Sequence, residues 1–351
     1  MILDGVRPLF HTLQGQVDSA YYTRHWRNGP HLRLNIRTTA SRFADVVRPA
    51  VDGIVGAFLT RHPSTKHLDP TRELAVHRRL AELEQEEGEL LPWFPDNTIV
   101  TAPYDARTAV VGGPQTAALV ADFQSRATAL AFRMTEELSP RQRLARSFDC
   151  MIAVAQTMAT RGITNGFISF RSHAEGFLCG FPESAGLRPA WDRHYDIHRE
   201  SLRSRVRAVV AAVPENIADV PFVQEWIAAL RPSWERAERL ASAGALALPM
   251  GVPAHFEAEA GDRVDLAEVS PFHQVLLANP TWEQTARSSA FLQYRLMLNL
   301  TYLMMTRIGV TPVERFLLCH LVANTVEDTY GVSAVELVRG RSASEQIAGI
   351  R

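Results

Sequence analysis

Cysteine is scarce in this chain of 351 residues, and its scarcity excludes several kinds of site. The three cysteines, Cys150, Cys179 and Cys319, lie far apart and form no Cys-x-x-Cys pair. Structural zinc sites and disulfide frameworks both need closely patterned cysteines, so neither is expected. We interpret the three thiols as small core residues in a protein of the reducing cytoplasm, and we expect no metal ion.

Long apolar runs and an excess of charge of either sign are also lacking. No run of about eighteen apolar residues occurs, so no membrane-spanning helix is expected. The N-terminus has no basic stretch followed by an apolar one, which argues against a secretory signal peptide. The 37 basic and 38 acidic side chains nearly cancel, so nothing favours nucleic acid or an anionic membrane as a partner. The sequence therefore predicts a soluble cytoplasmic protein.

Apolar spacing and proline positions predict strands early in the chain and helices later. Residues 15–40 are expected to form strand, turn and strand, residues 90–111 are extended, and residues 244–270 form a loop. Helices are predicted over 41–61, 71–87, 114–138, 140–159, 190–212, 221–241, 281–308 and 312–330, whereas 162–182 is ambiguous. This order is typical of an α+β fold, with an antiparallel or mixed sheet packed against helices and a mostly helical C-terminal third. We expect a single domain over residues 1–351.

Residues 21–36 gather aromatic rings, imidazoles and arginines around a Gly-Pro turn. From residue 31 onward polar and apolar side chains alternate, which is the pattern of a strand with one buried and one accessible face. The accessible face presents His31, Arg33 and Asn35, a row able to bind an amide or a carboxylate. A half-buried edge strand with a solvated polar face explains the same alternation without any function.

A polar stripe runs along the predicted helix at 281–308, which is otherwise mostly apolar. At about 100° per residue a narrow arc of that helix holds Ser288, Arg295, Asn299 and Tyr302, with Ser289, Gln293 and Tyr294 beside it. Buried polar groups need partners, so the stripe indicates either a wet cavity or an internal hydrogen-bond network. The residues alone leave both interpretations open.

Several blocks of the sequence resemble the elimination domain of class I lanthipeptide dehydratases, in that family's order. The blocks are His31-Leu-Arg-Leu, residues 104–113 with two closing glycines, residues 170–173, residues 270–282, and the helix 298–314. The resemblance covers nearly the whole chain, and it implies the α+β fold of that domain.

The chain departs from the family at the positions that carry elimination. The resemblance aligns Arg33 and Asn35 with an Arg-x-Arg pair, Arg107 and Val110 with a glutamate and an arginine, and Tyr302 with a histidine. Elimination of glutamate needs a base for the α-proton and cations for the leaving carboxylate. Valine supplies neither, and an arginine is not a usable base near pH 7. With these departures the chain resembles the thiopeptide pyridine synthases, which are derived from dehydratases.

That resemblance implies a substrate peptide that already carries a leader, dehydroalanines and azoles. Two dehydroalanines join in a formal [4+2] step, and loss of water and of the leader then yields a pyridine within a macrocycle. No cofactor is required. The proton-transfer roles are assigned to Tyr294, Tyr302, His25 and His173. The substrate-binding roles are assigned to Trp26, Arg33, Asn35, Trp282, Ser288, Ser289, Gln293, Arg295 and Asn299.

Two rival functions stay open at this point. The chain could be a stand-alone elimination partner that releases glutamate from glutamylated serine or threonine. It could also be a non-catalytic subunit that binds the leader and presents the precursor to other enzymes. Trp282 is equally well explained as a core residue. The sequence does not indicate the oligomeric state.

Overall fold

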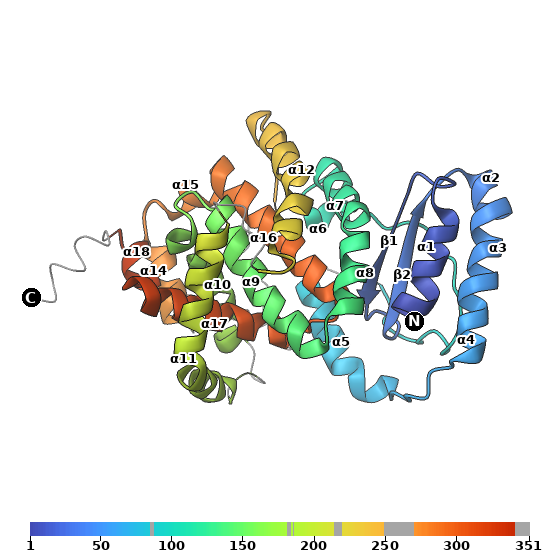
Figure 1. Cartoon of the computed structure of the whole chain (residues 1–351), viewed down its shortest axis with the longest axis horizontal. Coiled ribbons are helices and arrows are strands. Elements are labelled where there is room, and N and C mark those ends of the chain that lie inside the picture. The colour runs from blue at the N-terminus through green and yellow to red at the C-terminus, as the bar shows by residue number, and fades with distance from the viewer. Residues whose placement is uncertain (85–87, 181–183, 185, 214–219, 249–269, 341–351) are drawn as a thin grey trace, which may run out of the picture. The chain divides into compact units, whose positions relative to one another are not determined.

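A computed structural model describes residues 1–84, 88–180, 184, 186–213, 220–248 and 270–340 of the chain (Figure 1). Helices predominate, and the sheet of the described residues has two antiparallel strands near the N-terminus. The predicted antiparallel pairing and the helical C-terminal third are therefore confirmed, but helix outweighs strand more than the α+β prediction implied. None of the described helices is both long and apolar enough to cross a lipid bilayer. The predicted loop at 244–270 falls largely outside the described residues.

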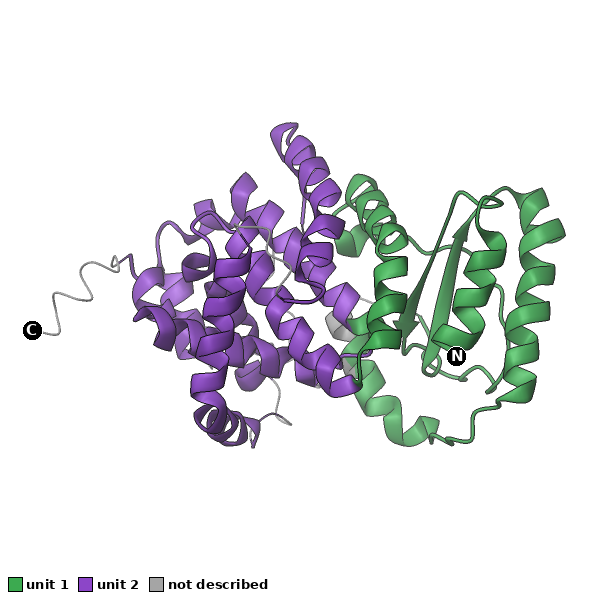
Figure 2. Ribbon diagram, viewed as in Figure 1, with its two compact units in different colours: residues 1–139, 306–308 green, residues 140–305, 309–351 purple. Residues whose placement is uncertain are grey.

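The chain divides into two compact units (Figure 2). Unit 1 comprises residues 1–139 and 306–308, and unit 2 comprises residues 140–305 and 309–351. This division does not test whether the units fold or act independently, so the single domain stays a prediction.

The two strands of unit 1 form the predicted hairpin. Strand β1 (Ser19–His25) pairs with β2 (His31–Arg37), so that Tyr21 faces Asn35, Thr23 faces Arg33 and His25 faces His31. Asn28 and Gly29 adopt positive φ angles of 56° and 97° in the connecting turn, a conformation that glycine and asparagine tolerate best. Residues 31–36 of β2 are all partly exposed, so the predicted division into a buried and an open face is wrong.

Helices surround the hairpin in unit 1. Their bounds are η1 Ile2–Val6, α1 Arg7–Leu13, α2 Ala40–Arg42, η2 Phe43–Val47, α3 Arg48–Ala50, η3 Val51–Gly56, α4 Ala57–Arg61, α5 Pro70–Glu84, α6 Thr108–Val111, α7 Pro114–Arg126 and α8 Thr128–Glu137. The ring of Phe132 on α8 stacks on Tyr22 of β1 at 5.5 Å and contacts Phe10 of α1 at 6.1 Å. Packing of these aromatic rings thus joins the hairpin, α1 and α8 in one core.

Arg307 is buried in the same core, although it carries a charge. Its guanidinium donates to the Gln124 carbonyl and the Thr128 hydroxyl, both at 2.7 Å, and lies 4.7 Å from the centre of the Tyr22 ring. Burial lowers its pKa to about 10. A buried cation needs such partners, so these contacts fix residues 306–308 within unit 1.

All regular secondary structure among the described residues of unit 2 is helical. Its helices are α9 Pro140–Met158, α10 Ile163–Gly180, α11 Leu187–Ala212, α12 Val223–Ser242, α14 Pro271–Ala278, α15 Trp282–Ala286, α16 Ser289–Arg307, α17 Pro312–Tyr330 and α18 Ala334–Val338, of which α16 ends in unit 1. Helix α17 begins as its sequence predicts, with Pro312 in the first position and a capping box between Thr311 and Glu314.

Two helix predictions need correction, and one ambiguous segment is resolved. The segment at 162–182, which the sequence left ambiguous, contains the helix α10 (Ile163–Gly180). The predicted helix at 114–138 is interrupted at Ala127, between α7 and α8. The predicted helix at 281–308 is broken between α15 and α16, where the Ser288 hydroxyl donates to the Thr285 carbonyl and accepts from the Phe291 amide. A serine that satisfies the first amides of a helix marks a start, so α16 begins there.

Gly166 on α10 sets the distance between three helices of unit 2. A Cβ atom at this position would lie 2.8 Å from the Tyr294 hydroxyl oxygen and 2.9 Å from the Cβ atoms of Ala155 and Ala159. Alanines cannot turn away, so α9 and α10 approach as closely as they do only because residue 166 has no side chain.

We therefore expect Gly166→Ala to destabilise the protein by about 1–3 kcal/mol through overpacking. Helix propensity alone would make alanine more stable than glycine by about 1 kcal/mol, so a loss of stability in Gly166→Ala can be attributed to packing. Gly53→Ala is the matched control, since its helical site has open space around the added Cβ. Chemical denaturation of both variants measures the difference; a Gly166→Ala protein as stable as the wild type would contradict the close packing.

Candidate functional site

His173 and Tyr302, both predicted from the sequence, meet in unit 2. The Tyr302 hydroxyl on α16 lies 2.8 Å from Nδ1 of His173 on α10 and 3.5 Å from the Cys319 sulfur on α17. Tyr302 and Cys319 are buried, whereas His173 is partly exposed. The three side chains form a short polar chain that joins three helices. We call it the His173–Tyr302–Cys319 chain.

All three groups of this chain are uncharged near neutral pH. Burial and the positive charges of Arg315 and Arg295 lower the pKa of His173 to about 3. Burial raises the pKa of Tyr302 well above its ordinary value and raises the pKa of the Cys319 thiol to about 11. The chain therefore offers neutral hydrogen-bond donors and acceptors, which can bind an amide without placing a charge beside it.

Tyr294 lies close to this chain. It is buried, and its hydroxyl donates to the Gly166 carbonyl of α10 at 2.9 Å. Burial raises its pKa, with a further contribution from Cys319. Gln293 is also buried, and burial lowers the pKa of Arg295. Unit 2 thus gathers four of the predicted residues, the two tyrosines, His173 and Arg295, into one region.

The remaining predicted residues of this stretch lie in other surroundings. Ser289 and Asn299 are exposed, and Ser288 is engaged in the break between α15 and α16. Trp282 is half-buried, with its ring edge-on to Phe291 at 5.5 Å. The polar arc is therefore not one continuous buried stripe, because the broken helix and the exposed Asn299 interrupt it.

The predicted residues of the N-terminal segment belong to unit 1. The His25 ring stacks on Trp26 at 5.7 Å and lies 5.4 Å from His31. Trp26 in turn packs at 5.2 Å against His77, a buried residue of α5. The side chain of Arg33 donates to the His31 ring at 3.3 Å. His25 and Trp26 thus belong to a cluster of rings, while Asn35 lies across the hairpin from Tyr21.

One histidine that the sequence did not single out is fully buried in unit 2. Nε2 of His273 on α14 lies 3.0 Å from the Ser172 hydroxyl, and its Nδ1 lies 2.8 Å from the Ser270 hydroxyl. Burial lowers the pKa of His273 to about 4. The two serines occupy both ring nitrogens, so His273 has structural partners on each side.

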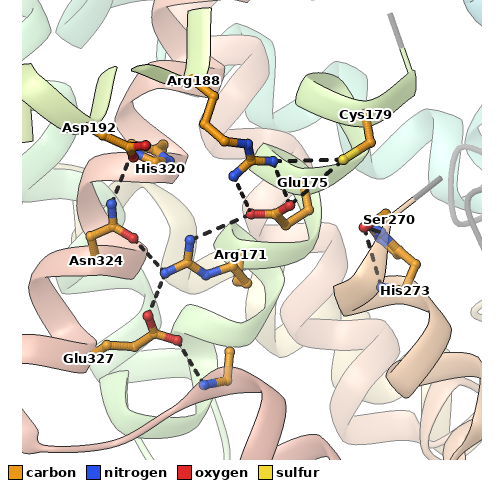
Figure 3. Close-up of polar contacts among 11 residues, drawn as sticks. Arg171, Glu175, Cys179, Arg188, Asp192, Ser270, His273, His320, Asn324 and Glu327 are labelled. Carbon is orange, nitrogen blue, oxygen red and sulfur yellow. Dashed lines mark hydrogen bonds and ion pairs between the residues drawn. The ribbon is translucent and has the colours of Figure 1, made fainter. Parts of the chain in front are cut away.

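A cleft of about 480 Å³ lies on another side of α10 in unit 2. Its lining residues are Arg171, Glu175, Cys179, Arg188, Pro271, Phe272, Glu327, Ser333 and Val335. Figure 3 shows the charged groups at its edge joined in a network. Arg188 donates both terminal nitrogens to Glu175, at 3.0 and 2.7 Å, and Arg171 donates to Glu327 at 2.5 Å.

Each guanidinium of this cleft is matched by a carboxylate, so the cleft offers no net charge to a ligand. Arg171, Glu175 and Cys179 follow a four-residue spacing, which places them on one helix face. A four-residue spacing places residues on one face only if the segment is a helix. Because the sequence left residues 162–182 ambiguous, this spacing did not identify the three residues as neighbours. Among the described ranges, no three His, Cys, Asp or Glu side chains converge as metal ligands.

Comparison with known proteins agrees with this architecture. Residues 1–326 match the family model described as "Lantibiotic biosynthesis dehydratase C-term". The chain is 35% identical to the solved structure of "Pyridine synthase, TbtD, from thiomuracin biosynthesis", with a TM-score of 0.73 over 95% of this chain and 94% of that one. It is 22% identical to TsrL, with a TM-score of 0.71 over 97% and 94% of the two chains, a likeness of fold. No curated protein sequence matches it.

We expect Glu175→Gln to lower the free energy of unfolding by about 2–3 kcal/mol, because it leaves Arg171 and Arg188 without their shared carboxylate. The side chain of Glu175 is only 10% exposed, so solvent cannot replace that charge fully. Asp196→Asn removes a carboxylate from the exposed Arg199 pair of the same unit and should cost less than about 1 kcal/mol. Denaturation of both variants at pH 7 checks the difference; equal losses would contradict it.

For Glu175→Gln we also predict how its stability, relative to the wild type, depends on pH. Burial alone would raise the pKa of Glu175, but the hydrogen bonds and charge of Arg188, with the charge of Arg171, lower it overall. A carboxyl group whose pKa is depressed on folding stabilises the protein above its unfolded value, about 4.3, and loses that effect as the pH falls further. The wild type should therefore lose its advantage over Glu175→Gln as the pH is lowered from 6 towards 3.

Proposed function

The chain belongs to the lantibiotic biosynthesis dehydratase C-terminal family, and we propose that within this family it is a pyridine synthase of thiopeptide biosynthesis. The observation that carries the proposal is its similarity, over nearly the full length of both chains, to a pyridine synthase. The positions at which the elimination residues are missing support it. Arg33 is followed by Asn35 instead of a second arginine, and Val110 stands where an arginine would hold the leaving carboxylate.

The proposed substrate is a modified precursor peptide with a leader and a core that bears dehydroalanines and azoles. One dehydroalanine and the preceding amide, as its iminol tautomer, form a 2-azadiene. The second dehydroalanine adds across it, so that two carbon–carbon bonds close a six-membered ring. Loss of the former amide oxygen as water and of the leader as a carboxamide then gives the pyridine. Electrons balance without an oxidant or reductant.

The enzyme's main task in this reaction is to bring two distant alkenes together. Orientation alone can contribute about 7–11 kcal/mol when the reacting atoms are held in the right geometry. We propose that Trp26, Arg33 and Asn35, with Trp282, Ser288 and Asn299, bind the substrate. Ser289, Gln293 and Arg295 would add hydrogen bonds to its amide oxygens.

The proton transfers are assigned to two tyrosines and two histidines. Tautomerisation moves a proton from an amide nitrogen to its oxygen, and dehydration and leader release each move another. Tyr302 and His173, joined at 2.8 Å, supply an uncharged donor and acceptor pair for these steps. Tyr294 and His25 are the further proton-transfer groups that we propose. The full chain, as one catalytic domain in the cytoplasm, would act on peptide made by partner enzymes.

A synthetic peptide with a leader, azoles and two dehydroalanines tests the proposed function directly. Incubation with the protein should convert it into a macrocycle and a free leader, detected by mass spectrometry. Loss of glutamate from a glutamylated peptide would instead identify an elimination enzyme. Binding of the leader with no change in the mass of the peptide would identify a presenting subunit, and either result would overturn the proposal.

Tyr302→Phe and Tyr294→Phe, made separately, should each slow ring formation by about 100-fold or more, the scale of one lost acid–base group. Each change removes a single hydroxyl, so circular dichroism should show an intact fold. Tyr330→Phe is the control, because its exposed ring lies at the end of α17, away from the proposed site residues. Full activity in both site variants would remove the two tyrosines from the mechanism.

A further inference from the structure

Two exposed histidines of α11, His194 and His198, lie about one helical turn apart. The centres of their rings are 4.6 Å apart, and the ring planes are inclined by 55°. Residues at positions i and i+4 share one face of a helix, so the two imidazoles lie side by side on the exposed face of α11. Neither histidine is among the residues that we propose to act on the substrate.

The nitrogens of both rings are available to a ligand. Among the described residues, no backbone or side-chain group hydrogen-bonds to either imidazole. The ring nitrogens of His31 and His273, by contrast, lie 2.7–3.3 Å from polar groups of the protein. Partial desolvation and the neighbouring His198 lower the pKa of His194, so its ring is neutral at pH 7 and keeps a lone pair free.

The separation of the two rings fits two ligands of one metal ion. A zinc-like ion binds an imidazole nitrogen at about 2.0–2.1 Å, which places it about 3.2 Å from the centre of that ring. Two imidazoles that meet at one ion at an angle of about 90–110° therefore have centres about 4.5–5.2 Å apart. The observed separation of 4.6 Å lies in this range. The helix thus holds the rings at the spacing of a chelate before any ion binds.

Two imidazoles form an open site with nitrogen ligands. Within the described ranges no third His, Cys, Asp or Glu side chain converges on the pair, so water completes the coordination. Imidazole ligands suit Zn²⁺, Ni²⁺ and Cu²⁺, of which Cu²⁺ binds most tightly, whereas Mg²⁺ and Ca²⁺ need oxygen ligands. The scarcity of cysteine argued against a closed structural zinc site, and an open pair of histidines is a different kind of site.

We propose that His194 and His198 form a chelating site on the surface of α11 for a divalent transition-metal ion. The ion binds reversibly, because water and competing ligands can exchange at its open positions. The two imidazoles share one face only while residues 194–198 are helical, so the bound ion stabilises this turn of α11. The site is independent of the proposed function, since it involves none of the residues assigned to the substrate.

Titration with Cu²⁺ tests the site, on protein without a histidine tag and in a buffer that does not chelate metals. The wild type should bind one ion tightly per chain, and pulsed EPR at one equivalent should detect two imidazole ligands. His194→Ala and His198→Ala, made separately, should each weaken binding by about 100-fold, the scale of losing a second attachment point. His67→Ala is the control, because it removes an exposed histidine of unit 1 and should leave the affinity unchanged.

A variant with the second histidine in the wrong place separates chelation from histidine content. Ser201→His combined with His198→Ala keeps two exposed imidazoles on α11, but they lie about 10 Å apart along the helix axis and cannot share an ion. It should bind Cu²⁺ as weakly as His198→Ala does. Zn²⁺ should raise the urea midpoint of unfolding in the wild type and not in this variant. Wild-type binding no tighter than that of this variant, or tight binding that survives in His194→Ala, would overturn the proposal.

Discussion

Close packing at Gly166 is the constraint on which the arrangement of unit 2 depends. Because residue 166 has no side chain, α10 lies against Ala155 of α9 and Ala159 just beyond the end of α9. The Gly166 carbonyl accepts from Tyr294 of α16. Two turns further along, α10 directs His173 towards Tyr302. Another face of the same helix directs Arg171 and Glu175 towards the charged network of the cleft. One helix therefore positions both the neutral proposed site and the charged cleft.

The two polar regions on α10 differ in a way that matters for chemistry. In the cleft, carboxylates and guanidiniums neutralise each other, which leaves little charge to bind a substrate. In the His173–Tyr302–Cys319 chain no group ionises near neutral pH. The charged side chains that act on His173, Arg295 and Arg315, are both positive. A reaction that converts neutral amides and alkenes into a neutral ring, and releases only water and an amide, places no charged substrate group in such a site.

Local sequence signals predicted the parts of this fold that local interactions determine. The Gly-Pro turn and the alternation beyond it located the hairpin, and prolines located the starts of α7, α9 and α17. Helical periodicity brought Tyr294, Arg295 and Tyr302 forward as candidates. Periodicity could not show that Ser288 breaks the helix or that Asn299 is exposed, since both depend on tertiary surroundings. The glycines and phenylalanines of α10 blurred its pattern, so the partners of Arg171 and Glu175 were missed.

The most direct test of the account is the chemical nature of the leader end after the reaction. The leader released from a bis-dehydroalanine peptide in ¹⁸O-labelled water should end in a carboxamide and carry no ¹⁸O, because aromatisation breaks a carbon–nitrogen bond of the dehydroalanine. A leader that ends in a carboxylate with solvent oxygen would show hydrolysis instead. That result would contradict a pyridine-forming [4+2] reaction on this protein.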